Sequence, residues 1–312
     1  MIPDDVRPGY LQLQENGVLE ERADQAYRLL SPCTVCPRRC GADRLNDERG
    51  FCRTGLIPVI SSYGPHFGEE PPLVGTSGSG TIFVTHCNLA CCFCQNYEIS
   101  QCGRGMETPP EKLAGIMLRL QQAGCHNINI VTPSHIIPPL IRAVSIAADR
   151  GLVIPLVYNS GGYDSVETLR LLDGIIDIYM PDAKYGSNDI AATLSHVPDY
   201  PGVMRAAIRE MHRQVGDLVI QDGIAVRGLI IRHLVLPANL AGSDVVLPWI
   251  SREISRDTYV NIMDQYHWPG QNFPESLEQK DSQFRELRRP VSAAEYAATV
   301  RWARDAGLHR GF

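Results

Sequence analysis

The chain has 312 residues, of which 44% are hydrophobic and 21% are charged, and its formal net charge is −6. This length allows one large α/β domain, alone or with a small module. The acidic balance and the lack of a Lys/Arg run argue against binding to nucleic acid through phosphates. Residues 1–5 lack a signal-peptide pattern, and no apolar stretch is long enough for a membrane span. We therefore expect a cytoplasmic protein without a membrane or nucleic-acid partner.

Helices and strands are predicted to alternate through most of the chain. The first part should hold a helix over residues 20–30, a cysteine-rich segment over residues 31–56 and a long loop over residues 57–78. Short apolar runs predict strands at residues 81–85, 127–132, 153–158, 175–180, 229–236 and 259–263. Helices are predicted at residues 110–123, 138–150, 165–172, 201–214, 245–255 and 293–306. A hairpin should turn at Asp222–Gly223, and a polar loop should precede the last helix.

Six strands that alternate with helices indicate an α/β fold. Several strands are nearly continuous apolar runs, as in a parallel sheet covered by helices. In parallel barrels and in open parallel sheets alike, chemistry gathers at the carboxyl ends of the strands. This pattern alone therefore leaves a partial or complete barrel and an open sheet as alternatives. We divide the chain into an N-terminal extension over residues 1–77 and a main domain over residues 78–312.

Ten cysteines are many for an intracellular chain, where clustered thiols usually bind metals or act in catalysis. Cys87, Cys91 and Cys94 follow the first predicted strand with the spacing C-x3-C-x2-C. Thiolates suit iron–sulfur clusters, and three of them leave one iron of a four-iron cube open, as a reactive metal requires. The alternatives are a zinc site and buried structural thiols. Cys92 lies inside the motif, but its spacing argues against a role as a ligand.

This motif, with the aromatic Phe93 before its last cysteine, resembles that of the radical S-adenosylmethionine (SAM) superfamily. Residues 78–83, 94–100, 157–163 and 177–185 further resemble its pyruvate formate-lyase-activating-enzyme-like branch. The resemblance implies a partial (β/α)6 barrel with a small N-terminal cysteine-rich module. It also implies a [4Fe–4S] cluster whose open iron is chelated by SAM. The cluster would cleave SAM to a 5′-deoxyadenosyl radical that abstracts a hydrogen atom, and Phe93 would lie near the adenine.

Further cofactor-binding residues follow from the same resemblance. Family members commonly carry Gly-Gly-Glu at the end of the second strand, whereas this chain has residues 132–135, of which Ser134 could accept the same hydrogen bonds. Asn159, Ser160, Asp182 and Lys184 correspond to positions near the methionine part of SAM or a monovalent cation. The alternative for the last two is a solvated ion pair in a loop.

Two later strands add candidates for the inside of the barrel. Arg232 could hold a substrate carboxylate or form a buried ion pair. On the last strand, alternation places Tyr259, Asn261, Met263 and Gln265 on one face, which either lines the barrel or belongs to the core.

The first cysteine group is Cys33, Cys36, Cys40 and Cys52. Four thiols can close a zinc site or hold an auxiliary iron–sulfur cluster. The alternative is a set of reduced structural cysteines.

Within the radical SAM hypothesis, one substrate is a glycine of a glycyl-radical enzyme, and the alternative is a small metabolite or peptide. A different class is a non-catalytic iron–sulfur protein for electron transfer or sensing. The expected partners are SAM, an electron donor such as a flavodoxin or ferredoxin, and in the first case the glycyl-radical enzyme.

Overall fold

The computed structural model describes residues 7–268, 270 and 282–312. Residues 1–5, on which the expectation about a signal peptide rests, lie outside the described residues, as does part of the predicted polar loop. No helix in the described part of the chain combines the length and apolar character needed to cross a membrane.

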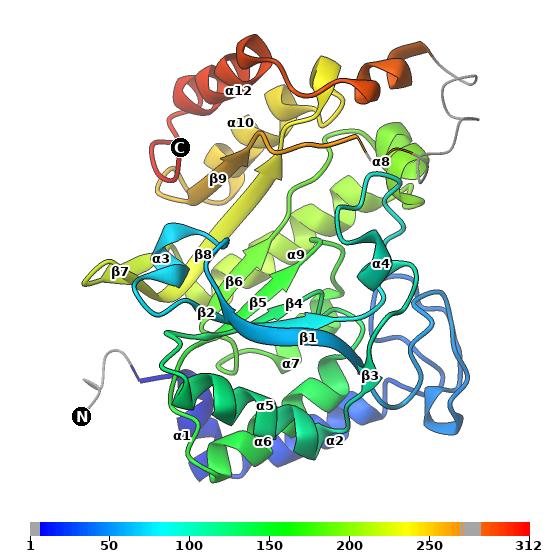
Figure 1. Cartoon of the computed structure of the whole chain (residues 1–312), viewed down its shortest axis with the longest axis vertical. Coiled ribbons are helices and arrows are strands. Elements are labelled where there is room, and N and C mark those ends of the chain that lie inside the picture. The colour runs from blue at the N-terminus through cyan, green and yellow to red at the C-terminus, as the bar shows by residue number, and fades with distance from the viewer. Residues whose placement is uncertain (1–6, 269, 271–281) are drawn as a thin grey trace.

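A single mixed sheet forms the centre of the molecule (Figure 1). Its strands follow the order β3-β1-β2-β4-β5-β6-β8-β7, and β9 pairs with β8. The strands that pair in parallel are β2 (Ser79–Val84), β4 (Ile128–Val131), β5 (Leu156–Ser160), β6 (Ile178–Pro181), β8 (Ile224–Leu234) and β9 (Tyr259–Met263). The antiparallel strands are β1 (Val59–His66), β3 (Met106–Glu107) and β7 (Val219–Gln221).

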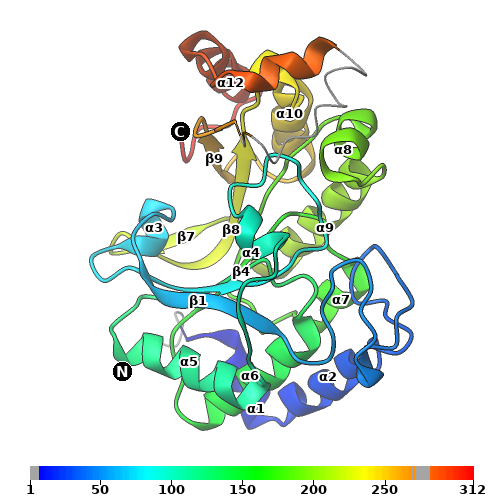
Figure 2. The same cartoon turned by 45° about the vertical axis from the view of Figure 1, so that its right-hand side comes forward.

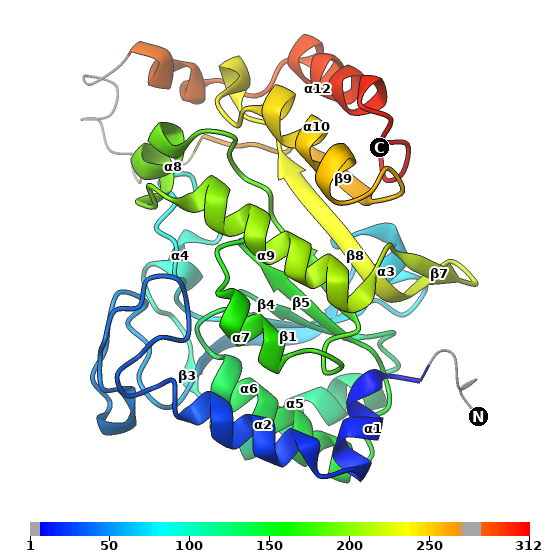
Figure 3. The same ribbon diagram turned by 180° about the vertical axis from the view of Figure 1, so that it is seen from behind.

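Helices cover the outer face of the parallel strands. On one side lie α1 (Gly9–Glu15), α2 (Val18–Tyr27), α5 (Pro110–Gln122) and α6 (Ile137–Asp149). Figure 3 shows α7 (Val166–Leu171) and α9 (Tyr200–Val215) on the same outer face, seen from behind. Further α-helices among the described residues are α3 (Pro71–Val74), α4 (Tyr97–Ser100), α8 (Asn188–Ser195), α10 (Ser243–Glu253) and α12 (Ala293–Asp305). Prolines in the first turns of α5, α6 and α9 suit these helix starts, since no intrahelical N–H bond is lost there.

The alternation of side chains along the strands separates the helix-covered face from the barrel interior. In β4, Ile128 and Ile130 belong to the core that packs under the helices, whereas Val131 lines an interior cavity. Val157 and Ile230 likewise belong to a separate interior cluster of apolar side chains. Because that cavity is lined from β2 at one end of the parallel series to β9 at the other, the sheet curves into a partial barrel. The predicted α/β fold is therefore confirmed.

The predicted loop over residues 57–78 is wrong, because this segment contains β1 and α3. β1 pairs with β2 along its length, but β3 covers only Val59 and Ile60 on its other side. The rest of β1 is therefore an edge, where Pro65 can occupy a strand without losing a ladder bond. The short helices α1, α4 and α8 and the short strand β3 were also not predicted. Although β1 joins the main sheet, the proposed division between residues 77 and 78 stays a prediction.

The first cysteine group lies on loops that pack against the barrel near α4 and α7 (Figure 2). Arg38 donates a hydrogen bond from Nε to the carbonyl of Asn88 at 2.9 Å, and Thr168 in α7 donates to the carbonyl of Val35, also at 2.9 Å. Arg44 is 1% exposed and donates from Nη1 to the carbonyl of His135. These contacts join the cysteine-rich segment to the carboxyl-terminal edge of the barrel.

The predicted hairpin at Asp222–Gly223 is confirmed, and it leads into a β8 that begins earlier than predicted. Within β8, Gly228 has a φ of 118°, and its amide donates to the carbonyl of Asp177 beside β6. A Cβ atom at this position would lie 2.4 Å from the carbonyl oxygen of Asp217 and 2.5 Å from the Cα of Leu218. Both contacts are with backbone, so they cannot be relieved by rotating a side chain.

We predict that Gly228→Ala lowers the free energy of unfolding by about 2–4 kcal/mol, through backbone strain and overpacking together. The matched control is Gly202→Ala in α9, where an added Cβ meets nothing within 4 Å. That change should be neutral or stabilise by up to about 1 kcal/mol. Urea unfolding of both variants measures the difference, and equal stabilities would contradict this account of β8.

Candidate functional site

A cavity of about 250 Å³ lies at the carboxyl-terminal edge of the parallel strands. Most of the candidate residues line it: Cys87, Cys91, Phe93, Cys94, Asn159, Ser160, Asp182 and Lys184. Met263 at the end of β9, Gln265 just after it and Arg232 from β8 also line it, whereas Tyr259 and Asn261 of the same predicted face do not. The fold thus gathers residues more than a hundred positions apart around one space.

The three motif cysteines lie on the loop between β2 and α4, and each is a free thiol with a polar contact. The Cys87 sulfur accepts a hydrogen bond from the backbone N–H of Leu89 at 3.3 Å. The Cys91 sulfur accepts one from the Ser195 hydroxyl at 2.9 Å, and the Cys94 sulfur lies 3.1 Å from the Ser100 hydroxyl. Such partners orient metal ligands and adjust the charge on their sulfur atoms.

Burial raises the pKa of the Cys87 and Cys91 thiols, although the charge of Lys184 opposes this effect at both. Thiolates are the form that binds metal, so a bound cation must supply the charge that keeps these sulfurs deprotonated. Three soft donors around one cavity with no fourth cysteine in its lining fit a cluster with an open corner. Within the described residues, no three His, Cys, Asp or Glu side chains converge as a single metal ion requires. A four-iron cube does not require such convergence, because each thiolate binds a different iron.

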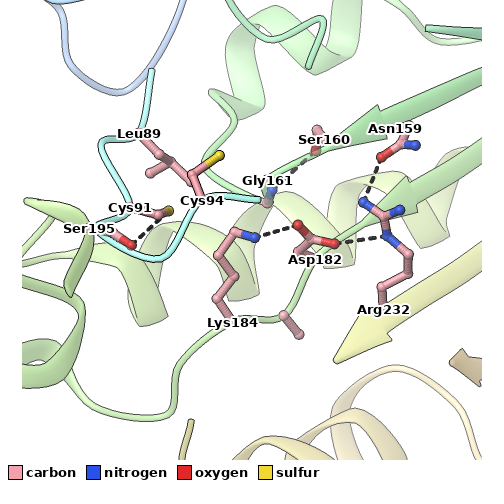
Figure 4. Close-up of polar contacts among 12 residues, drawn as sticks. Leu89, Cys91, Cys94, Asn159, Ser160, Gly161, Asp182, Lys184, Ser195 and Arg232 are labelled. Carbon is pink, nitrogen blue, oxygen red and sulfur yellow. Dashed lines mark hydrogen bonds and ion pairs between the residues drawn. The ribbon is translucent and has the colours of Figure 1, made fainter. Parts of the chain in front are cut away.

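Asp182 joins two cations beside the cysteine loop (Figure 4). Its carboxylate accepts from the Lys184 ammonium at 2.5 Å and from Nε of Arg232 at 2.9 Å. Arg232 also donates from Nη2 to the side-chain oxygen of Asn159 at 2.7 Å. Burial alone would raise the pKa of Asp182, but the charges of Arg232 and Lys184 hold it below its usual range. Asp182 is therefore ionised and fixes both cations at the cavity wall.

Two glycines after β5 allow the loops to approach one another closely. A Cβ on Gly161 would lie 2.7 Å from the Leu89 side chain on the cysteine loop. Gly162 has a φ of 76°, and a Cβ there would lie 2.1 Å from the carbonyl oxygen of Asp182. The Tyr200 hydroxyl bridges the same loops by donating to the carbonyls of Gly161 and Asp182. These contacts fix the distance between the cysteine loop and the charged residues.

Ser160 and Ser134 are placed differently from each other. Ser160 lines the cavity, donates to the buried carboxylate of Asp164 at 2.6 Å and accepts from the backbone N–H of Gly162. Ser134 is buried and does not belong to the lining of this cavity, to which Thr132 contributes instead. The roles of both serines in cofactor binding stay predictions.

The structure also separates residues that lie close together in the sequence. Cys92 is buried and does not line the cavity, in agreement with the spacing argument. Phe93 is buried against the rings of Tyr185 and Tyr266 and lines the cavity. Ser195, which contacts Cys91, was missed because α8 was not predicted, and no motif in the sequence marks it.

The thiols of the first cysteine group do not converge as a single metal ion requires. Cys33, Cys36 and Cys52 are buried and Cys40 is exposed. Burial raises the pKa of Cys36 to about 12, and the neighbouring thiols add to this effect. The lack of convergence on one point among the described residues bears on a zinc ion but not on an iron–sulfur cluster. A zinc ion or auxiliary cluster here stays a prediction.

Comparisons with known proteins agree with this geometry. A family model described as "Radical SAM superfamily" matches residues 81–225. The chain is 32% identical over 264 residues to "Uncharacterized protein MJ0674" of Methanocaldococcus jannaschii. This alignment covers 82% of the chain and 72% of the relative. The fold of this chain is similar to that in the crystal structure of HydG, with a TM-score of 0.50 and 14% identity. HydG is described as a maturase of the [FeFe]-hydrogenase. That match covers 74% of this chain and half of the HydG chain, and at this identity it shows the fold alone.

The cysteine motif after the first parallel strand, the partial barrel and these matches agree with one another. The chain belongs to the radical SAM superfamily.

Proposed function

We propose that this chain is an enzyme in which Cys87, Cys91 and Cys94 hold the [4Fe–4S] cluster that membership of the superfamily implies. The observation that carries the proposal is that these three thiols line one cavity with the Asp182, Lys184 and Arg232 charges. When bound and reduced by a donor such as a flavodoxin or ferredoxin, the cluster supplies the electron that cleaves SAM to a 5′-deoxyadenosyl radical, which abstracts a hydrogen atom from the substrate.

The residues around the cavity suggest how SAM would be held. Lys184 is a point charge suited to a carboxylate, and Asp182 keeps it at the wall of the cavity. Phe93 offers an apolar surface for the adenine. Asn159 and Ser160 would position the methionine part of SAM, although both already hydrogen-bond within the protein. These roles form part of the proposal.

The identity of the substrate divides the proposal in two. The resemblance of residues 157–163 and 177–185 to activating enzymes supports hydrogen abstraction from a glycine of a glycyl-radical enzyme. The polar side chains inside the barrel support direct chemistry on a small metabolite or peptide. A glycyl-radical EPR doublet on a partner protein would support the first, and a modified small molecule would support the second.

The general proposal is tested by reconstituting the full chain with iron and sulfide without oxygen, reducing it and adding SAM. We expect about four iron atoms per chain, as a [4Fe–4S] cluster requires, and the formation of 5′-deoxyadenosine and methionine. A protein that takes up a cluster but forms no 5′-deoxyadenosine would instead be an electron-transfer or sensor protein.

We predict that Cys94→Ala reduces bound iron and SAM cleavage by at least about 100-fold, since losing even an outer partner of a ligand costs 10–100-fold. Cys92→Ala is the matched control, because this neighbouring thiol is buried away from the cavity. It should keep its iron and its activity. Circular dichroism checks that both variants are folded, and full iron content in folded Cys94→Ala would refute the ligand assignment.

We predict that Ser195→Ala shifts the midpoint potential of the cluster by about 30–60 mV to more negative values. A hydrogen bond to a ligand sulfur favours the reduced cluster, and one worth about 1 kcal/mol corresponds to this shift for one electron. Tyr185→Phe is the control, since it removes a hydroxyl 2.6 Å from Ser195 but leaves the contact with Cys91. An EPR-monitored redox titration measures both, and equal potentials would show that the contact with Cys91 has no electronic effect.

A further inference from the structure

A group of polar side chains lies inside the barrel, one layer deeper than the cavity. Asn129 precedes the cavity-lining Val131 by two residues in β4, and Asn261 precedes Met263 by two residues in β9. Residues two apart on a strand share a face, so both asparagines are placed on the interior face. Glu69 and Glu70 reach the same region from the segment between β1 and α3, and α3 packs beside β8.

Several of these polar atoms are buried without a partner in the described structure. Asn129 is fully buried and its amide makes no well-formed hydrogen bond, although it lies close enough to the Glu69 carboxylate to oppose the rise in the pKa of that group. Glu70 is 5% exposed and accepts from the Asn261 amide at 2.9 Å through Oε1, but its Oε2 has no partner. Leaving a buried polar group unsatisfied costs about 1–3 kcal/mol. Incompletely bonded atoms on two different elements therefore mark a place where a polar ligand or water can bind.

The charges in this region favour a cation. Three carboxylates, Asp182, Glu69 and Glu70, surround Arg232, while Lys184 pairs with Asp182 and the imidazole of His66 lies near Glu69. Asp182 forms ion pairs with both Lys184 and Arg232. No Lys, Arg or His in the described part of the chain forms an ion pair with Glu69 or Glu70. Burial raises the pKa of Glu69, and Arg232 acts in the opposite direction. With His66 neutral, one further positive charge would balance the group.

The arrangement suits a nitrogen cation better than a metal ion. Among the residues that the structure describes, no three acidic, His or Cys side chains converge closely enough to hold a metal. An ammonium or guanidinium group carries several N–H donors and can join acceptors that lie apart. Glu69, Arg232 and Asn261 keep part of their surface exposed, so the group is not sealed from solvent.

We propose that Glu69, Glu70 and Asn129 form a subsite for an ammonium or guanidinium group of the substrate, which makes the substrate an amine-bearing molecule. This inference rests on the proposed function, since it places a substrate in the barrel of a radical SAM enzyme. Arg232 lies between this subsite and the cavity with Lys184, and its positive charge repels a cation from the cofactor side. The substrate would therefore bind with its cationic end deep in the barrel and its other end toward the cysteine loop.

The test compares butan-1-ammonium with butan-1-ol, which has nearly the same shape but no charge. Both are titrated calorimetrically into the full chain, reconstituted without oxygen and saturated with SAM. A charge-assisted hydrogen bond contributes about twice as much as a neutral one, so we expect the ammonium to bind at least about tenfold more tightly. Glu70→Gln should remove most of this preference, whereas Glu111→Gln, on the exposed surface of α5, should retain it.

Asn129→Leu provides a second variant that does not depend on the fold tolerating a change at Glu70. Replacing a buried amide that makes no well-formed hydrogen bond with an apolar group of similar size should lower the melting temperature little. This variant should nevertheless lose about tenfold in affinity for the ammonium.

The inference is overturned if the ammonium binds no more tightly than the alcohol to the protein saturated with SAM, or if folded Glu70→Gln and Asn129→Leu keep the preference. Measuring SAM cleavage by the same wild-type preparation distinguishes a failure of the subsite from a failure of the proposed function. Cleavage without a preference for the ammonium rejects the subsite alone, whereas the absence of cleavage rejects the proposed function.

Discussion

The parallel pairing of β2, β4, β5, β6, β8 and β9 is the constraint on which the site depends. It brings the carboxyl ends of six strands to one edge, so residues far apart in the chain meet around one cavity. Asp182 then bridges Lys184 and Arg232 across neighbouring strands. Removing one partner from such a buried group typically costs 3–5 kcal/mol, so this bridge fixes the charged wall beside the cysteine loop.

Much of the fold was predictable because its parallel strands are nearly continuous apolar runs with helices between them. The strand over residues 259–263 and the helices that begin at Pro110 and Ala293 agree closely with the structure. β1 escaped prediction because, as an edge strand containing Gly64 and Pro65, it lacks a regular apolar pattern. β5 begins and ends later than predicted. Asn159 and Ser160 therefore belong to the strand and not to the turn after it.

The site was predictable where residues belong to a spaced motif, as the three cysteines do, or follow the end of a strand, as Asp182 and Lys184 do. The alternative of a solvated Asp182–Lys184 pair is wrong, because both side chains are largely buried and bonded to one another. Ser195, Tyr200 and Glu70 could not be predicted, since their roles arise only from tertiary contacts. Of the two alternatives for Arg232, the structure shows a buried ion pair, and this pair uses its Nε and Nη2 within the protein.

The central claim is that three thiolates leave one iron of the cluster open to SAM. The most direct measurement is pulsed EPR of the reduced, reconstituted protein with SAM labelled with ¹⁵N at its amino group and with ¹⁷O at its carboxylate. The account predicts hyperfine coupling of both labels to the cluster. The absence of coupling in a protein that holds a four-iron cluster, with the fourth iron bound instead by a side chain of the protein, would contradict it.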